Sequence, residues 1–106
     1  MSGACGNLFA DLPAATREEQ TQELLHSPNV RIERIVSHGY ASPPGFWYDQ
    51  HDDEWVLIVR GRAALEFDGG ETVDMKEGDY LFIPRHVRHR VARTSASTIW
   101  LAVHLK

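Results

Sequence analysis

The segment from Gly78 to His89 constrains the fold of this 106-residue chain more than any other part. Glycine reaches the left-handed backbone region freely, so Gly78 and Asp79 predict a tight turn. The apolar run over residues 80–83 then predicts a short buried strand. Pro84 has no N–H group and therefore ends that strand or marks an edge. His89 begins a new alternating segment, and its fixed offset from Pro84 aims one imidazole into a barrel.

Strand-like segments separated by turn residues fill most of the remaining chain. They are predicted at residues 30–36, 54–60, 62–67, 72–75, 80–83, 89–93 and 98–105. Many short strands with regular turn signals favour an all-β sandwich or barrel. The aromatic run at residues 46–48 also favours extended structure.

The N-terminal part of the sequence has a different pattern. Residues 1–15 are predicted to form an extended arm. Thr16 and Glu19 fit a capping box, and Leu24 and Leu25 supply an apolar side, so a short helix is predicted before the turn at residues 27–29. We therefore expect an arm with a short helix over residues 1–29 and a barrel over residues 30–106.

Two blocks of the sequence resemble the two motifs of the cupin superfamily. Gly78, Pro84 and His89 match the second motif in type and spacing, whereas His86 and Arg93 stand where that motif has glycine and asparagine. Glu54, followed after six residues by Gly61, is similar to the end of the first motif. The likeness spans about residues 30–105. It is strongest to small single-domain bacterial cupins, which mostly have no assigned function. It implies an antiparallel β-sandwich barrel, or jelly roll.

The resemblance also implies a divalent transition metal (Fe, Mn, Zn or Ni) held by two histidines, the motif glutamate and the later histidine. Glu54 and His89 occupy the last two of these positions. The histidine pair falls on Trp47 and Asp49 in one register, or on Tyr48 and Gln50 in the other.

His51 has the family's spacing from Gly45 but not its spacing from Glu54. Three interpretations of the site remain open. Asp49, Glu54 and His89 bind a metal, with His51 or water completing the shell, or with His51 in place of Asp49. Alternatively, Glu54 and His89 form a metal-free pair that orients a ligand or transfers protons. In the third interpretation, the side chains of Glu54 and His89 only act as polar partners for each other within the core.

Four further residues are candidates for the pocket. Trp47 and Tyr48 could stack on a planar or sugar-like ligand or could be ordinary core aromatics, and a pleated strand turns only one of them inward. Arg34 either points inward and favours an anionic ligand or is solvated and ion-paired. His104 is either a pocket residue or a terminal-strand histidine with a backbone partner.

The strand predicted at residues 54–60 has an unusually apolar outer face. If Glu54 faces the interior, then Trp55, Leu57 and Val59 face outward. Either the N-terminal segment or a second subunit must cover them, and we predict a homodimer because symmetric dimers are the commonest oligomers.

Composition excludes several classes of function. No stretch approaches the roughly 18 apolar residues of a membrane span. The basic residues at 85–93 include no reader motif, and a net charge of −4 argues against nucleic acid as a partner. A lone cysteine, Cys5, and an N-terminus without the pattern of a secretory signal favour a cytoplasmic location.

Two hypotheses about function follow from the sequence. The first is a small-molecule-binding cupin, with metal-dependent dioxygenase or isomerase chemistry implied by the resemblance and with Glu54 and His89 as catalytic residues. The second is a non-catalytic, metal-free binding or sensor module that acts as a homodimer.

Overall fold

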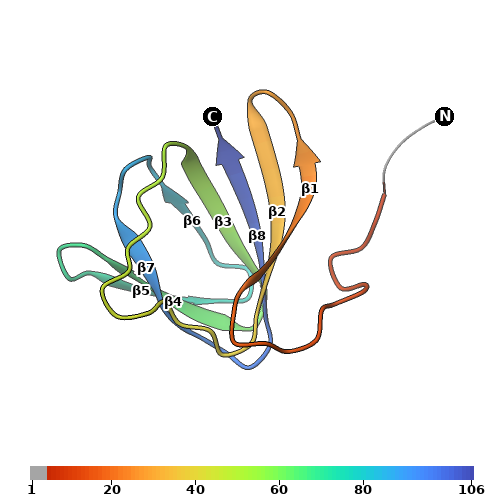
Figure 1. The fold of residues 1–106 in the computed structure, drawn as a ribbon, viewed down its shortest axis with the longest axis horizontal. Helices are drawn as coiled ribbons and strands as arrows, with labels where there is room; N and C mark the ends of the chain where they lie inside the picture. The colour runs from red at the N-terminus through yellow and green to blue at the C-terminus, as the bar shows by residue number, and fades with distance from the viewer. Residues whose placement is uncertain (1–4) are drawn as a thin grey trace.

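Within the part of the chain that the structure describes, eight antiparallel strands form two sheets (Figure 1). The computed structural model describes residues 5–106. The strands are β1 (Gln20–His26), β2 (Val30–Ser37), β3 (Asp53–Arg60), β4 (Arg62–Phe67), β5 (Thr72–Lys76), β6 (Tyr80–Ile83), β7 (His89–Thr94) and β8 (Thr98–Leu105). One sheet has the order β1-β2-β8-β3-β6 and the other the order β5-β4-β7.

The sequence-based prediction of an all-β sandwich barrel is confirmed. Each strand predicted between residues 30 and 105 is present, and its bounds agree with the prediction to within one residue. Gly78 has a φ of +88° in the turn before β6, as its place in the motif requires. The aromatic run at residues 46–48 forms only an isolated bridge, in which Tyr48 pairs with His89.

The predicted N-terminal helix is wrong, because its residues form β1, and no residue in the described range 5–106 is helical. β1 and β2 form a hairpin around residues 27–29. The side chain of Glu19 accepts hydrogen bonds from Ser37 and Tyr48 instead of capping a helix. Pairing with β2 thus overrides a local signal that is individually weak. Of the predicted arm, residues 1–4 lie outside the described residues.

The core lies between the two inner sheet faces. β2, β8, β3 and β6 are in register, so alternate residues from each strand form rows that run across the larger sheet. The buried apolar side chains of the core come from both sheets. They are Val56, Ile58, Ala63, Leu65, Met75, Ile83, Val91, Trp100 and Ala102.

Arg34 lies on the outer face of the larger sheet, not in the barrel. Its guanidinium is buried and donates to the backbone carbonyls of Leu8, Ala10 and Asp11, at 3.2, 2.7 and 3.4 Å. The expectation that Arg34 favours an anionic ligand in the pocket is therefore corrected, since this residue secures the N-terminal arm. Among the described residues there is no helix with the length and apolarity needed to cross a membrane.

Candidate functional site

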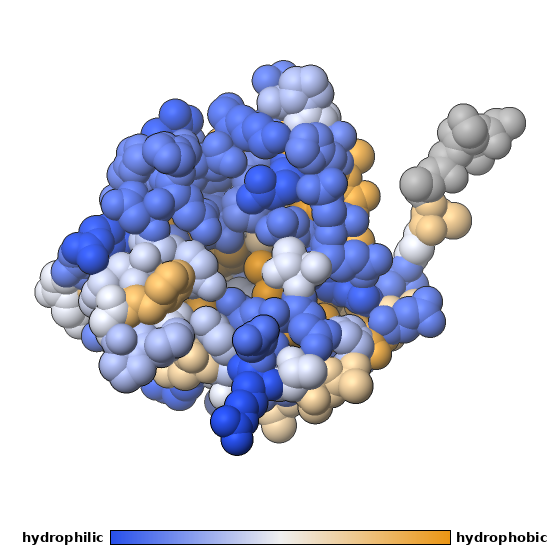
Figure 2. Space-filling view, in the orientation of Figure 1, coloured by the Kyte–Doolittle hydropathy of each residue, from blue (hydrophilic) through white to orange (hydrophobic). Residues whose placement is uncertain are grey.

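A cavity of about 160 Å³ opens between the two sheets. Figure 2 shows it as a hollow with hydrophobic surface at its bottom and a hydrophilic rim. Its apolar lining includes Val56, Leu65 and Trp100 of the core. Its polar lining consists of Glu19, Thr21, Arg31, Glu33, Tyr48, Gln50, Glu54, His89 and His104. The cavity therefore combines an apolar floor with converging polar groups, as ligand sites do, but it has more titratable side chains than such sites usually have.

Strand alternation places Glu54 in this cavity. Glu54 pairs with His104 of β8 and with Ile83 of β6, and Arg31 of β2 pairs with His104 on the other side. These residues form one row across the inner face, because directly opposed residues share a face of a sheet. Glu54 is 6% exposed and His104 is 3% exposed.

His89 reaches the cavity from the smaller sheet. Its backbone pairs with that of Tyr48, and its ring stacks on the Tyr48 ring at a centroid distance of 5.4 Å. Its Nδ1 lies 2.9 Å from the Val87 carbonyl oxygen. In the neutral ring Nδ1–H must donate this bond, so the lone pair of Nε2 points toward Glu54. His89 Nε2 and Glu54 Oε1 are 3.7 Å apart, so the structure brings together the two residues on which the sequence analysis depended.

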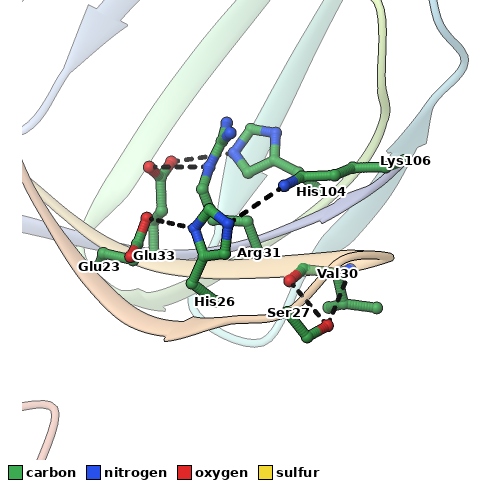
Figure 3. Close-up of polar contacts among 8 residues, drawn as sticks. All are labelled: Glu23, His26, Ser27, Val30, Arg31, Glu33, His104 and Lys106. Atoms are coloured by element: carbon green, nitrogen blue, oxygen red, sulfur yellow. Dashed lines mark hydrogen bonds and ion pairs between the residues drawn. The ribbon is translucent and has the colours of Figure 1, made fainter.

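Arg31, Glu33 and His104 form a second polar cluster (Figure 3). His104 Nε2 is 2.9 Å from Glu33 Oε1, and Arg31 Nε is 3.2 Å from Glu33 Oε2. His104 Nε2 also lies 3.9 Å from Glu54 Oε2. The side chain of His104 thus has a carboxylate partner rather than a backbone one, and it belongs to the pocket.

Glu19 closes another part of the cavity wall. The hydroxyl groups of Ser37 and Tyr48 each donate to its carboxylate at 3.1 Å. Burial raises the pKa of Glu19, and the nearby charge of Glu54 acts in the same direction, whereas the two hydroxyl donors oppose them. Burial and the neighbouring Glu19 carboxylate also raise the pKa of Tyr48, so its phenol keeps its proton at neutral pH.

The structure distinguishes the two registers proposed for the family's histidine pair. Tyr48 and Gln50 line the cavity, whereas Asp49 and His51 are exposed outside it. Asp49 Oδ1 is 2.8 Å from Nδ1 of His86, and the His51 ring packs edge-on against the His86 ring. The structure does not bring Asp49 and His51 together with Glu54 and His89, because successive residues of an extended chain point to opposite sides.

Trp47 likewise points away from the cavity, and its ring lies 5.7 Å from the guanidinium carbon of Arg88. Tyr48 is therefore the aromatic residue of this pair that contacts the cavity. Its ring also packs edge-on against Phe46, at a centroid distance of 4.8 Å.

The side chains present do not fit the metal shell that the family resemblance implies. Within residues 5–106, no three histidine, cysteine, aspartate or glutamate side chains converge as metal ligands. A protonated phenol at Tyr48 and an amide at Gln50 replace the two imidazoles, and transition metals prefer imidazole, thiolate and carboxylate donors.

Two glutamates and one arginine of the site were not predicted from the sequence. They are Glu19, Arg31 and Glu33. Alternation in β2 could have indicated Arg31 and Glu33 once Arg34 was assigned to the opposite face. Glu19 lies outside the strands, before β1, and no local pattern places its side chain in the cavity.

The two-sheet barrel and its interior carboxylate and imidazole define the class of this protein as a small β-barrel with an internal ligand pocket. The sequence matches the Cupin domain family over residues 32–104, so the chain belongs to the cupin family.

Two solved structures illustrate the relationship. A Ralstonia eutropha JMP134 protein, provisionally described as a mannose-6-phosphate isomerase, is 50% identical, with a TM-score of 0.93 over 98% of this chain and 99% of that one. A cupin superfamily protein of Desulfitobacterium hafniense DCB-2 is 20% identical, with a TM-score of 0.78 over 99% and 94% of the two chains, and supports the fold alone.

Curated relatives include a 3-hydroxyanthranilate 3,4-dioxygenase of Paraburkholderia phytofirmans, 41% identical over 66 residues. The match covers 57% of this chain but only 38% of that enzyme. The chain therefore spans less than half the length of that enzyme, and this match supports membership of the family but not the same activity.

Proposed function

We propose that the barrel cavity binds a small polar molecule without requiring a metal, and that Glu54 and His89 contact it. One observation carries the proposal. A buried carboxylate and a buried imidazole from different sheets face each other across 3.7 Å in an open cavity, without a hydrogen bond between them. Buried polar groups normally have hydrogen-bond partners, so this pair lacks a group that a ligand can provide.

The same pair can move a proton on a bound ligand. A carboxylate accepts protons, and a neutral imidazole with a free Nε2 lone pair is a general base. Because Nδ1 of His89 is held by the Val87 carbonyl, a proton taken up at Nε2 would give an imidazolium stabilised by Glu54. Binding without chemistry, as in a sensor module that acts as a homodimer, uses the same contacts.

A metal-dependent dioxygenase or isomerase is the second candidate. It is supported by the activities for which the relatives are named, and Glu54 and His89 would be its metal ligands and catalytic residues. Mannose 6-phosphate carries a phosphate group, whereas this cavity is lined by three glutamates and one arginine. The charge of the cavity therefore favours neither that substrate nor a chemistry built on anion binding.

A ligand screen on the unaltered protein tests the proposed function. We expect small polar molecules to shift the amide resonances of residues around the cavity in protein with no metal. Glu54→Gln and His89→Gln should weaken this binding at least tenfold, whereas the exposed control Glu71→Gln should not change it. Purification without chelator followed by elemental analysis tests the second candidate. Stoichiometric transition metal that is lost in both variants would support it and contradict the metal-free proposal.

A further inference from the structure

Two groups that meet across the cavity without a hydrogen bond, the Glu54 carboxylate and Nε2 of the neutral His89 ring, are acceptors. One donor of the lining, Arg31 Nε, also makes no hydrogen bond, but its charge is paired with Glu33 at 3.2 Å. The side chain of Glu54 is only 9% exposed, and its oxygens lie 3.7 and 3.9 Å from the nearest histidine nitrogens, beyond hydrogen-bond distance. Within residues 5–106, no donor hydrogen-bonds to this carboxylate. A buried carboxylate without donors is costly, so the cavity favours an occupant that supplies them.

His89 adds a further acceptor beside Glu54. With Nδ1–H donating to Val87, the neutral ring of His89 directs its Nε2 lone pair at the carboxylate, so two acceptors face each other. A donor placed between Glu54 Oε1 and His89 Nε2 satisfies both atoms, whereas an additional acceptor would be repelled by them.

The charges around the cavity also favour a ligand that donates hydrogen bonds. The positive charge of Arg31 is paired with Glu33, which also accepts the hydrogen bond from His104. Glu19 accepts two hydroxyl donors, from Ser37 and Tyr48. Glu54 is the carboxylate left without a partner.

We propose that the cavity selects small organic cations, in which an ammonium or guanidinium group donates N–H bonds to Glu54 and His89 Nε2. The inference rests on the proposed function and specifies its ligand class. It replaces the anionic ligand expected from the sequence, which depended on an inward-pointing Arg34. A cation also meets the preference of a desolvated carboxylate for a charge-assisted donor.

The dimensions of the cavity limit the rest of the ligand. A volume of about 160 Å³ corresponds to about five water molecules at roughly 30 Å³ each. This is well below the roughly 300 Å³ at which pockets begin to hold drug-sized molecules. The floor formed by Val56, Leu65 and Trp100 suits a short alkyl group. The expected ligand is therefore a short alkyl amine or a molecule of similar size and charge.

Three probes with three carbon atoms each and different charge test the proposal: n-propylammonium, 1-propanol and propanoate. We expect n-propylammonium to bind the unaltered metal-free protein at pH 7 at least tenfold more tightly than either other probe, as measured by titration of amide resonances. Glu54→Gln should reduce its affinity at least tenfold, and Glu71→Gln should leave the affinity unchanged. Because the order of the three probes is measured on the unaltered protein, the test does not depend on whether the Glu54 variant folds.

Each contrary outcome has a distinct meaning. Equal or tighter binding of propanol or propanoate overturns the preference for cations but leaves small-molecule binding in the cavity intact. Binding of Mn²⁺ or Zn²⁺ that requires Glu54, without binding of the ammonium probe, overturns the proposal in favour of a metal site. Failure of all three probes overturns the cation inference, and only failure of the broad ligand screen as well would overturn the proposed function.

Discussion

Glu19 in the cavity wall makes the free energy of unfolding depend on pH. Burial raises its folded-state pKa above the ordinary value of 4.5, so the folded protein holds this proton to higher pH than the unfolded chain does. The contribution of Glu19 to the free energy of unfolding is therefore complete at acidic pH and is lost as pH rises from 4.5 through the raised folded pKa.

Glu19→Gln removes this titration and keeps an acceptor for Ser37 or Tyr48. We expect the unfolding free energy of the variant, relative to the unaltered protein, to increase as pH rises from about 4 to neutrality. Urea denaturation of both proteins across this range measures the difference. A difference that stays constant or decreases with rising pH would contradict the assignment of a raised pKa to Glu19.

His86 occupies the place that is glycine in the family motif, and its backbone shows why. Its φ is +62°, in the left-handed region that glycine adopts without strain. The side chain is exposed and its pair with Asp49 lies at the surface, where ion pairs contribute little. We expect His86→Gly to raise the free energy of unfolding by about 0.5–1 kcal/mol, because relief of the backbone strain outweighs removal of the ion pair with Asp49. Chemical denaturation measures this, and a destabilised variant would show that the ion pair outweighs the strain.

The residues of the cavity differ in how far the sequence could predict them. Glu54 and His89 could be paired because each stands at a motif-defined spacing, Glu54 before Gly61 and His89 after Pro84, and strand alternation then fixes its face. Arg31 and Glu33 could not be assigned with equal certainty, because both faces of β2 contain apolar and charged residues. The row of Arg31, His104 and Glu54 depends on register between strands distant in sequence, which no local pattern specifies.

At the level of elements, the sequence predicted strands best where both faces are partly buried. β3 and β8 alternate between buried and less buried positions, and their bounds were found to within one residue. β1 is an edge strand with mostly exposed side chains, so its composition has little hydrophobic periodicity. Its strand form comes from hydrogen bonds with β2, and a capping signal at Thr16 and Glu19 was insufficient to specify a helix.

The β3–β4 connection offers a test of close packing at a turn. Gly61 has a φ of +87°, and a Cβ there would lie 2.3 Å from the Ser97 carbonyl oxygen and 2.5 Å from Ser95 Oγ. Gly78 has nearly the same φ, +88°, with no atom within 4 Å of its Cβ position. Gly61→Ala therefore adds steric overlap to the backbone strain that Gly78→Ala incurs alone.

We expect Gly78→Ala to cost about 1–2 kcal/mol of unfolding free energy and Gly61→Ala to cost at least about 3 kcal/mol. Urea denaturation of the two variants under the same conditions measures both values. Equal costs would show that the loop at residues 95–97 moves aside without penalty.

At the scale of the whole molecule, the outer face of the larger sheet is covered over β2 but is more exposed toward β6. The N-terminal arm lies over β2, where Arg34 holds its carbonyls, and Phe9 packs against the guanidinium of Arg60. Toward β6, the outer face has aromatic side chains that are exposed. Trp55 and Tyr80 pack together there at a centroid distance of 5.6 Å. Tyr80 and Phe82 are 68% and 50% exposed.

This exposed face supports the homodimer expected from the sequence. Val103, Trp55 and Phe82 form one cross-strand row, and Leu101, Leu57 and Tyr80 form the next, so the apolar surface extends from β8 to the edge strand β6. A two-fold axis through such a face buries the same aromatic residues from both subunits, and symmetric dimers are the commonest oligomers. A second copy of this chain is therefore the partner that we expect.

Phe82→Lys tests this expectation without altering the cavity. A lysine at the β6 edge of this face must be desolvated in the interface or opposed by its own symmetry mate, so we expect dimer affinity to fall at least tenfold. Light scattering coupled to size-exclusion chromatography should give a dimer mass for the unaltered protein at micromolar concentration and a monomer mass for the variant. Phe46→Lys is the matched control, because Phe46 is 41% exposed but lies in the segment before Tyr48, away from this face. A monomer mass for the unaltered protein would contradict the dimer, and loss of the dimer in the Phe46 variant as well would contradict the assignment of the interface to β6.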